Sequence, residues 1–168
     1  VIFFSDNGGA GIADNAPLRG HKGLVFEGGV RVCSAIRYPR RISAGTSNSA
    51  FLTSLEIFPT LLNLAGIAPP EGVVLDGFDM MPVLAEDERS PREEMYWKRR
   101  AKEAARVGCW KWIRDEDGTF LFDLSQDVGE QEDLSDRLPE KTAEMQACFD
   151  GWMQRMNEAE PRGPFKDF

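Results

Sequence analysis

The sequence VIFFSDNGG (residues 1–9) places four apolar residues directly before a serine, an aspartate, an asparagine and two glycines. An uninterrupted apolar run of this length predicts a short buried strand over residues 1–4, as in a parallel sheet. In open α/β sheets, ligands bind where the strands reach their carboxyl ends. Asp6 and Asn7 therefore stand where a ligand would be expected to bind, and the chemistry of their side chains indicates the kind of ligand.

The Asp6-Asn7 pair has two interpretations. Asn7-Gly8 is typical of a hairpin turn, but the following GAGIADNAP (9–17) offers no partner strand. A carboxylate and an amide oxygen are hard donors suited to Ca²⁺ or Mg²⁺, and the glycines would let backbone or substrate approach closely. The hairpin is thereby weakened, but a metal site stays an open interpretation, because Ca²⁺ takes about six or more ligands and the others would have to come from elsewhere.

A second candidate site lies in PLRGHKG (17–23), where a lysine and the only histidine of the chain stand between glycines. Lys22 could neutralise an anionic substrate as a compact point charge, with a solvated surface lysine as the alternative. His21 is a second candidate for substrate binding, or a polar loop residue. Downstream, Glu27 and Arg31 of EGGVR are predicted to pair and brace a tight turn.

Composition and charge exclude several classes of protein. A length of 168 residues allows one core, with room for a subdomain. The net charge of −8 argues against a nucleic-acid partner, which needs a basic footprint. No run reaches the roughly 18 apolar residues of a membrane span. Three scattered cysteines form neither a disulfide framework nor a zinc motif, so we expect free structural thiols.

The rest of the first half predicts an α/β arrangement. VRVCSAIRYP (30–39) has strand character and ends at a proline. TSLEIFPTLLNLAG (53–66) predicts a helix, because Thr53 and Glu56 form a capping-box pattern and Gly66 supplies a C-terminal stop. Strands and a helix in this order predict the closing part of an α/β sheet with flanking helices.

From about residue 92 the sequence changes to short, aromatic-rich runs that predict a small antiparallel sheet. Asp117-Gly118 between the last two runs predicts a hairpin. A final helix is expected to begin near Pro139, and its apolar stripe predicts packing against the small sheet, with a partner groove as the alternative. The runs are EMYWK (94–98), EAARVG (103–108), CWKWIRD (109–115) and TFLFDL (119–124), and the stripe is Met145, Phe149, Trp152, Met153 and Met156.

These motifs, in this order and over essentially the whole chain, resemble the C-terminal half of a sulfatase. The resemblance implies an alkaline-phosphatase-like mixed α/β sheet that closes in residues 1–91, followed by a C-terminal subdomain over residues 92–168. Val128 and Asp133 stand where a proline and an asparagine are common in the family. The motifs are VIFFSDNGG, PLRGHKG, FEGGVRV (26–32), SLEIFPTLLNLAGI (54–67), LDGFDMMPVL (75–84), CWKWIRD and FLFDLSQDVGEQEDLSD (120–136).

The resemblance also implies roles for particular residues. Asp6 and Asn7 match the aspartate and asparagine that help bind the catalytic divalent cation, most often Ca²⁺, with Mg²⁺ as the alternative. Lys22 matches the lysine that contacts the sulfate group. The family attacks with a formylglycine made from the cysteine of a Cys-x-Pro/Ala-x-Arg motif near the start of the protein. No residue of this chain matches that nucleophile with the right context.

The stretch CSAIR (33–37) fits Cys-x-Ala-x-Arg literally, but we reject Cys33 as the nucleophile. The family motif opens a helix, whereas this stretch lies in a predicted strand and runs into Tyr38-Pro39. We expect Cys33 to be a core thiol. The chain, which begins within a strand, is then a piece of a longer sulfatase and inactive alone, its partner being the N-terminal half of the parent.

Two alternatives stay open. One is another hydrolase of the same superfamily, such as a phosphodiesterase or a phosphonate hydrolase. The other is a non-catalytic relic or interaction module. The expected substrate is a sulfated small molecule or a sulfated glycan, and the family suggests a periplasmic, secreted or lysosomal location without fixing one.

Overall fold

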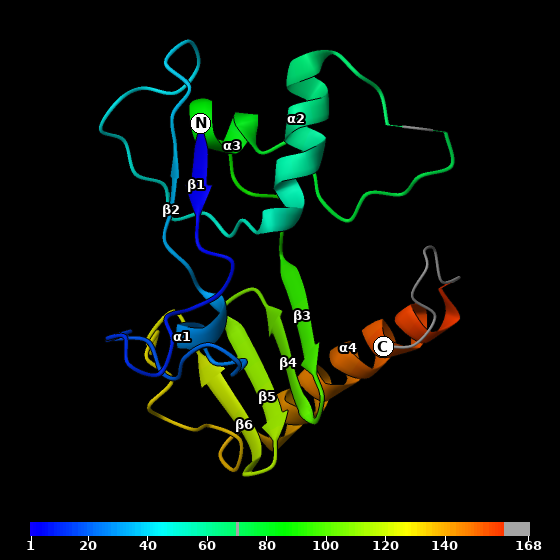
Figure 1. Cartoon of the computed structure of the whole chain (residues 1–168). Coiled ribbons are helices and arrows are strands. Elements are labelled where there is room, and N and C mark those ends of the chain that lie inside the picture. The colour runs from blue at the N-terminus through cyan, green and yellow to red at the C-terminus, as the bar shows by residue number, and fades with distance from the viewer. Residues whose placement is uncertain (70, 160–168) are drawn as a thin grey trace. The chain divides into compact units, whose positions relative to one another are not determined.

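The computed structural model describes residues 1–69 and 71–159. The chain forms two compact units (Figure 1). The first unit combines residues 1–4 with residues 34–93, and the second combines residues 5–33 with the chain from residue 94 onward. The predicted domain boundary at residue 92 stays a prediction, because units defined by compact packing need not coincide with the domains of a protein family.

The first unit contains the strand predicted at the start of the chain. Strand β1 (Ile2–Phe4) pairs antiparallel with β2 (Ser34–Ile36), with Phe3 opposite Ala35. The expectation of a buried, parallel strand is wrong for this chain, since the side chain of Phe3 is 71% exposed. An apolar run predicts burial, but burial also needs neighbours, and β1 has only β2 beside it among the described residues.

The predicted helix of the first unit is confirmed. The 3₁₀ turn η1 (Ser54–Glu56) leads into α2 (Ile57–Ala65), and a short helix α3 (Met81–Ala85) follows. Thr53 and Glu56 form the predicted capping box, and Gly66 ends α2 in the left-handed conformation with φ 68°.

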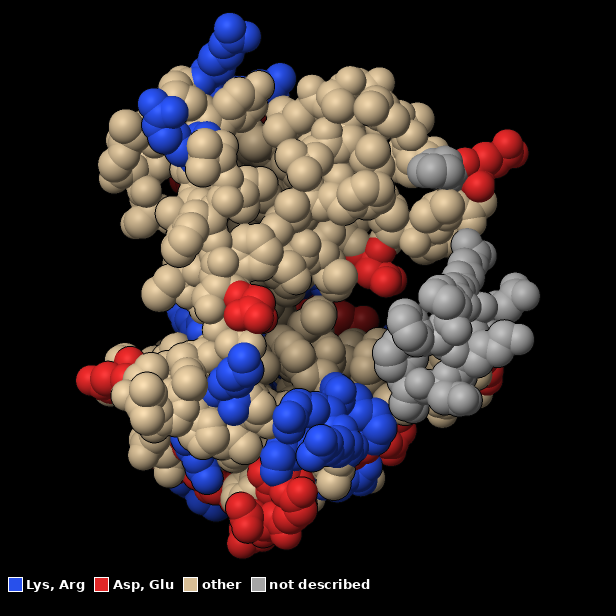
Figure 2. Space-filling view, viewed as in Figure 1, with Lys and Arg blue, Asp and Glu red and all other residues tan. Residues whose placement is uncertain are grey.

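Large apolar side chains of β1 and of the η1–α2 segment are exposed in the first unit, and its visible face carries few charges (Figure 2). Exposure on this scale is unusual for a monomeric domain and marks a surface that normally packs on something else. The exposed side chains are Phe3, Phe4, Leu55, Phe58, Leu61 and Leu64.

The second unit is built on the predicted antiparallel sheet, with strand order β3-β4-β5-β6. The strands are β3 (Glu94–Arg99), β4 (Lys102–Val107), β5 (Trp110–Asp115) and β6 (Gly118–Asp123). The predicted hairpin joins β5 to β6.

Helix α4 (Pro139–Glu158) packs on one face of this sheet. Met145 and Phe149 are buried against Trp112 and Tyr96, and Trp152 stacks on Tyr96 with 5.4 Å between the ring centroids. The predicted start of the helix is confirmed, and so is the packing of its stripe on the small sheet, except that Met156 is exposed. Among the described residues, no helix is long and apolar enough to span a membrane.

The other face of the sheet carries part of the segment 5–33. Val25 and Phe26 are buried against Ile113 and Phe122, and the short helix α1 (Glu27–Val30) follows them directly. Side chains alternate along a strand, so Trp112 faces α4 while its neighbour Ile113 faces the loop segment. Figure 1 shows α1 and α4 on opposite sides of the sheet.

Helix α1 corrects one prediction. Residues 30–39 were expected as a strand, but Val30 ends α1 and only residues 34–36 form β2. The reason is that Gly28 and Gly29 let the backbone turn tightly beside Arg19 and Leu24, where a side chain would collide with carbonyl oxygens.

Candidate functional site

The loop of residues 5–9 carries the predicted metal ligands. Asp6 is exposed and Asn7 is half-buried. Ser5 fixes the turn, because its Oγ donates to the carbonyl oxygen of Asn7 at 2.8 Å. The amide Nδ2 of Asn7 donates to the carbonyl oxygen of Gly8 at 3.0 Å. Within residues 1–69 and 71–159, no hydrogen bond or ion pair engages the Asp6 carboxylate, which leaves its oxygens available to a ligand.

The two glycines of this loop stand where a Cβ would collide with neighbouring atoms. The Gly8 N–H donates to the carbonyl oxygen of Gly29 in α1 at 2.9 Å. A Cβ added to Gly8 would lie 1.8 Å from the carbonyl oxygen of Gly28, and one added to Gly9 would lie 2.4 Å from Oδ1 of Asn15. The obstacle at Gly8 is backbone, so this glycine serves the close backbone approach expected from the sequence, whereas the obstacles at Gly9 are the side chains of Asn15 and Ala13.

The loop of residues 19–24 lies directly beside the first loop. The Lys22 N–H donates to the carbonyl oxygen of Gly9 at 2.8 Å. Asn15 bridges the loops, since its Nδ2 donates to the carbonyl oxygens of Gly9 (3.3 Å) and Gly20 (3.1 Å), and its Oδ1 accepts from the Gly9 N–H (3.2 Å). The structure thus brings together the two segments that the sequence singled out. Asn15 itself was missed, because an asparagine in a Gly/Ala-rich loop carries no distinguishing pattern.

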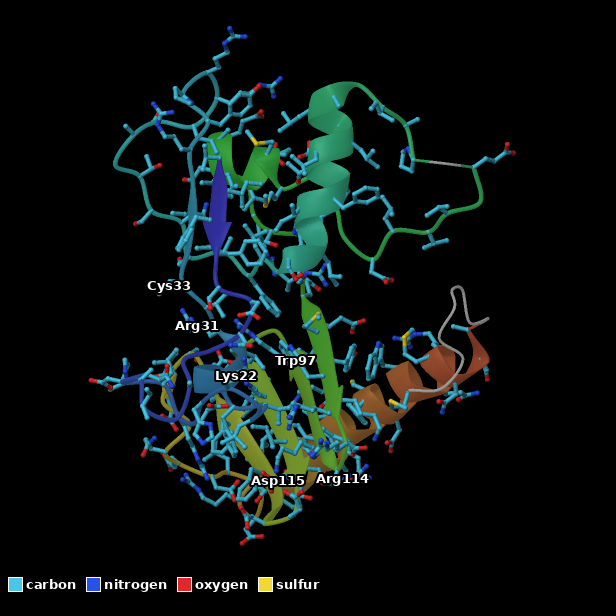
Figure 3. The ribbon with its side chains drawn as sticks, in the orientation of Figure 1. Lys22, Arg31, Cys33, Trp97, Arg114 and Asp115 are labelled. Atoms are coloured by element: carbon cyan, nitrogen blue, oxygen red, sulfur yellow. The ribbon has the colours of Figure 1, made fainter. Side chains whose placement is uncertain are left out.

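The side chains of Lys22 and His21 are both exposed. Figure 3 shows Lys22 beside α1. Nδ1 of His21 lies 3.0 Å from the carbonyl oxygen of Lys22. Gly20 and Gly23 flank the pair with φ of 83° and 92°, a conformation that favours glycine. The lysine is therefore presented to solvent on a loop of defined backbone geometry.

Helix α1 supports both loops and is fixed by a buried carboxylate. Oε1 of Glu27 lies 2.7 Å from Nζ of Lys111 on β5, and both side chains are almost completely buried. The predicted Glu27–Arg31 pair is confirmed at 3.7 Å, and Arg106 lies 4.0 Å from the same oxygen, Oε2. The closest partner, Lys111, was not predicted, because a lysine in a strand is expected to face solvent.

A second buried carboxylate completes this cluster. Oε2 of Glu130 accepts a 2.7 Å hydrogen bond from the Glu27 N–H, and its Oε1 lies 3.3 Å from Nζ of Lys111. Arg19 donates from Nη1 to the carbonyl oxygen of Glu130 at 3.0 Å. Burial raises the pKa of the Glu130 carboxyl, and Lys111 opposes part of that rise.

The donor chemistry at Asp6 and Asn7 fits part of a divalent-cation site. Both residues offer oxygen donors of the kind that Ca²⁺ and Mg²⁺ prefer. Among the described residues, no group of three or more His, Cys, Asp or Glu side chains is close enough to hold a metal. The two residues therefore fit as ligands only together with further ligands, and the cation stays a prediction.

The position of Cys33 corrects a further expectation. Cys33 is exposed, so the prediction of a core thiol is wrong, because the residue precedes a strand of a two-stranded sheet rather than one within a core. It lies directly before β2, so CSAIR does not open a helix. All three cysteines are free, as predicted.

Comparison with known proteins identifies the family. Residues 20–159 match the family model described as N-sulphoglucosamine sulphohydrolase, C-terminal. The N-acetylgalactosamine-6-sulfatase of Canis lupus familiaris is 34% identical over 117 residues, which are 66% of this chain and 22% of that protein. A sulfatase of Formosa agariphila is 39% identical over 103 residues, which are 58% of this chain and 19% of that protein.

Solved structures agree with the sequence matches. Ps i-CgsB, solved in complex with k-i-k-neocarrahexaose, has a TM-score of 0.79 and 30% identity, covering 90% of this chain and 35% of that one. A protein solved with its substrate D-glucosamine-2-N,6-O-disulfate shares the fold, with a TM-score of 0.62 at 24% identity over 80% of this chain and 30% of that one. This chain thus spans about a third or less of these relatives.

The predicted fold class is confirmed by these neighbours and by the four-stranded antiparallel sheet with its C-terminal helix. The chain belongs to the family described as N-sulphoglucosamine sulphohydrolase, C-terminal, and forms the C-terminal part of the sulfatase fold.

Proposed function

We propose that this chain supplies one side of the active site of a sulfatase, an enzyme that hydrolyses sulfate esters. The observation that carries the proposal is the hydrogen bond from the Lys22 N–H to the carbonyl oxygen of Gly9. It holds the loop with the sulfate-binding candidate against the loop with the metal-binding candidates. Membership of the sulfatase family supports the reaction class.

Each candidate residue has a defined task in this proposal. The Lys22 ammonium neutralises the negative oxygens of the sulfate group, and His21 lies beside it as a second polar contact. Asp6 and Asn7 would hold a divalent cation, Ca²⁺ or in its place Mg²⁺, together with ligands from outside this chain. When bound, such a cation supplies electrostatic stabilisation of the developing negative charge.

The nucleophile is proposed to lie outside this chain, as a formylglycine in the N-terminal part of the parent protein. The chain covers 22% of the sulfatase from Canis lupus familiaris, which leaves ample length for that part. The exposed apolar side chains of the first unit, among them Phe3 and Phe58, offer a surface for it to cover. The isolated chain is accordingly expected to be inactive.

The substrate is proposed to be a sulfated glycan or a sulfated small molecule. The relatives include an N-acetylgalactosamine-6-sulfatase and a steryl-sulfatase, named for a sugar and for a sterol. Both kinds of substrate present the same sulfate group to a cation such as Lys22. The part of the substrate beyond the sulfate is what distinguishes them.

The proposal is tested with the full-length protein that contains this chain. Hydrolysis of p-nitrophenyl sulfate is measured beside hydrolysis of a phosphate diester and a phosphonate monoester. We expect the sulfate ester to be preferred, and Lys22→Ala to lower kcat/KM for it by roughly 100-fold, as removal of one charge-stabilising group does. Lys141→Ala, in α4 on the other face of the sheet, is the matched control and keeps full activity.

Other outcomes would overturn the proposal. Preference for the phosphate or phosphonate ester would make the parent a different hydrolase of the superfamily. No hydrolysis of any of the esters would favour a non-catalytic relic. Full activity of Lys22→Ala would remove the lysine from the site.

A further inference from the structure

We propose that Lys111 is a positioning residue of this site: by pairing with Glu27 and Glu130, it fixes α1 and thereby the two loops that carry the candidate ligands. Lys111 is the second residue of β5, and its side chain is completely buried. This inference rests on the sulfatase function proposed above.

The geometry of the cluster joins three separate segments of the chain. Nζ of Lys111 lies 2.7 Å from Oε1 of Glu27 at the start of α1 and 3.3 Å from Oε1 of Glu130 after β6. The Glu27 N–H also donates to Oε2 of Glu130 at 2.7 Å. Nζ further lies 5.4 Å from the ring centroid of Trp97, which covers it on another side. The lysine is therefore held from several directions rather than by one flexible contact.

The cluster connects to the first loop through α1. The carbonyl oxygen of Gly29 accepts the 2.9 Å hydrogen bond from the Gly8 N–H, next to Asn7. Because Gly8 packs on Gly28 with no room for a Cβ, a shift of α1 would move this loop with it. Lys111 thus acts on Asp6 and Asn7 through the helix.

The cluster connects to the second loop through Arg19. The Gly28 N–H donates to the carbonyl oxygen of Arg19 at 2.7 Å, and the Arg19 side chain donates to the carbonyl oxygen of Glu130 at 3.0 Å. The guanidinium also lies 4.2 Å from the ring centroid of Phe26. Arg19 begins the loop that presents Lys22. Its contacts with Gly28 and Glu130 therefore fix this loop to α1 and to the buried cluster.

The charges of the cluster explain why Lys111 cannot be removed without a shift. Glu27 also faces Arg31 at 3.7 Å and Arg106 at 4.0 Å, so it keeps positive neighbours without the lysine. Glu130 faces Lys111, the Glu27 N–H and the Glu27 carboxylate, and no other ion pair reaches its carboxylate among residues 1–69 and 71–159. Without Lys111, Glu130 would be a buried carboxylate beside a second one, an arrangement in which both cannot stay ionised at low cost.

The test uses Lys111→Met in the full-length protein, with p-nitrophenyl sulfate as substrate and inorganic sulfate as a competitive probe from pH 5 to 9. Burial raises the pKa of the Glu130 carboxyl, and below that pKa Glu130 is neutral while Glu27 keeps Arg31 and Arg106 beside it, so the cluster keeps its place. As the pH rises, the second buried charge forms and displaces α1. We therefore expect KM and the sulfate inhibition constant to rise by roughly 10- to 100-fold above the pKa of Glu130, since a displacement of about 1 Å has such an effect.

Two further variants separate positioning from packing. Lys111→Met/Glu130→Gln removes the repulsion between the two carboxylates, while the introduced amide oxygen still accepts from the Glu27 N–H. The added pH dependence should therefore vanish, and the sulfate inhibition constant should return toward the wild-type value. Trp112→Phe is the matched structural control, because Trp112 is buried on the α4 face of the same strand. It should lower the melting temperature and leave the sulfate inhibition constant unchanged at every pH.

Each outcome decides the question. A sulfate inhibition constant of Lys111→Met that equals the wild-type value at every pH overturns the inference, however unstable the variant. If Lys111→Met does not fold, the double variant decides: a double variant that folds and binds sulfate with no pH dependence beyond that of wild type supports the inference, and one whose inhibition constant still rises with pH above the wild-type value overturns it. A wild-type protein that neither hydrolyses the ester nor binds sulfate refutes the proposed function itself, and this is seen before any variant is compared.

Discussion

The Lys22 N–H donates a 2.8 Å hydrogen bond to the carbonyl oxygen of Gly9. This bond joins two neighbouring loops whose candidate binding residues differ in chemistry. One loop offers oxygen donors for a cation, and the other offers a cation for an anion. A sulfate ester bound between a metal ion and a lysine needs both kinds of group on one side. The backbone contact sets their spacing before any ligand binds.

Gly8→Ala is expected to disturb this spacing. The new Cβ would lie 1.8 Å from the carbonyl oxygen of Gly28, which is backbone and cannot move aside like a flexible side chain. Overpacking of this kind costs about 1–3 kcal/mol of stability, and it should also lower kcat/KM because the loop of Asp6 moves. The matched control is Gly11→Ala in the same loop region, where nothing lies within 4 Å of the added Cβ. Equal thermal melts and activities for the two variants would contradict the prediction.

Asn15→Asp is expected to separate the two loops. The substitution keeps the acceptor for the Gly9 N–H but replaces the Nδ2 donor, which now serves the carbonyl oxygens of Gly9 and Gly20, with a charged oxygen that repels them. The loss of such hydrogen bonds costs about 1–3 kcal/mol. We expect a higher KM for p-nitrophenyl sulfate, whereas Asn157→Asp on the exposed side of α4 should keep the wild-type KM. A wild-type KM in Asn15→Asp would show that the loops hold their spacing without the asparagine.

Local sequence patterns predicted the local structure well. The capping box of Thr53 and Glu56, the left-handed Gly66 and the start of α4 at Pro139 each depend on a few neighbouring residues, and each is confirmed. The backbone approach expected at Gly8 is confirmed as well.

Features that depend on distant residues escaped prediction. Lys111 and Glu27 are 84 residues apart in the sequence, and neither shows from its neighbours that it is buried. Lysine is almost never buried unless it is paired, so only its partner could reveal its position. The prediction for Phe3 was wrong in the opposite sense: the residue was expected to be buried and is exposed, because an apolar residue is buried only where something packs on it.

The sheet of the second unit should lose an ion-pair contribution in acid. Burial raises the pKa of Glu103, but hydrogen bonds from Lys98 (2.5 Å) and Arg114 (2.8 Å) outweigh it and hold the pKa below its usual range. A depressed pKa gives stability that is present above the ordinary glutamate pKa of about 4.3 and is lost as the pH falls through the folded value. Glu103→Gln should therefore melt below wild type at pH 7, with the difference shrinking toward pH 3.

The exposed pair of Glu93 and Arg89 provides the control for this acid effect. Surface pairs contribute little, so Glu93→Gln should match the wild-type melting temperature at both pH values. A Glu103→Gln difference that is the same at pH 7 and pH 3 would contradict the assigned cause.

Asp6→Ala combined with Asn7→Ala is expected to weaken Ca²⁺ binding by the full-length protein, because two oxygen donors of the proposed cation site are removed together. The affinity is measured by calorimetric titration of the metal-free protein, a readout that does not depend on turnover. Asp14→Ala is the matched control: its carboxylate accepts the Ala16 N–H at 2.9 Å in the same loop region, so the calcium affinity should stay at the wild-type value. If the double variant also kept that value, the cation would have to bind elsewhere, and Asp6 and Asn7 would be a polar turn held in place by Gly8 and α1.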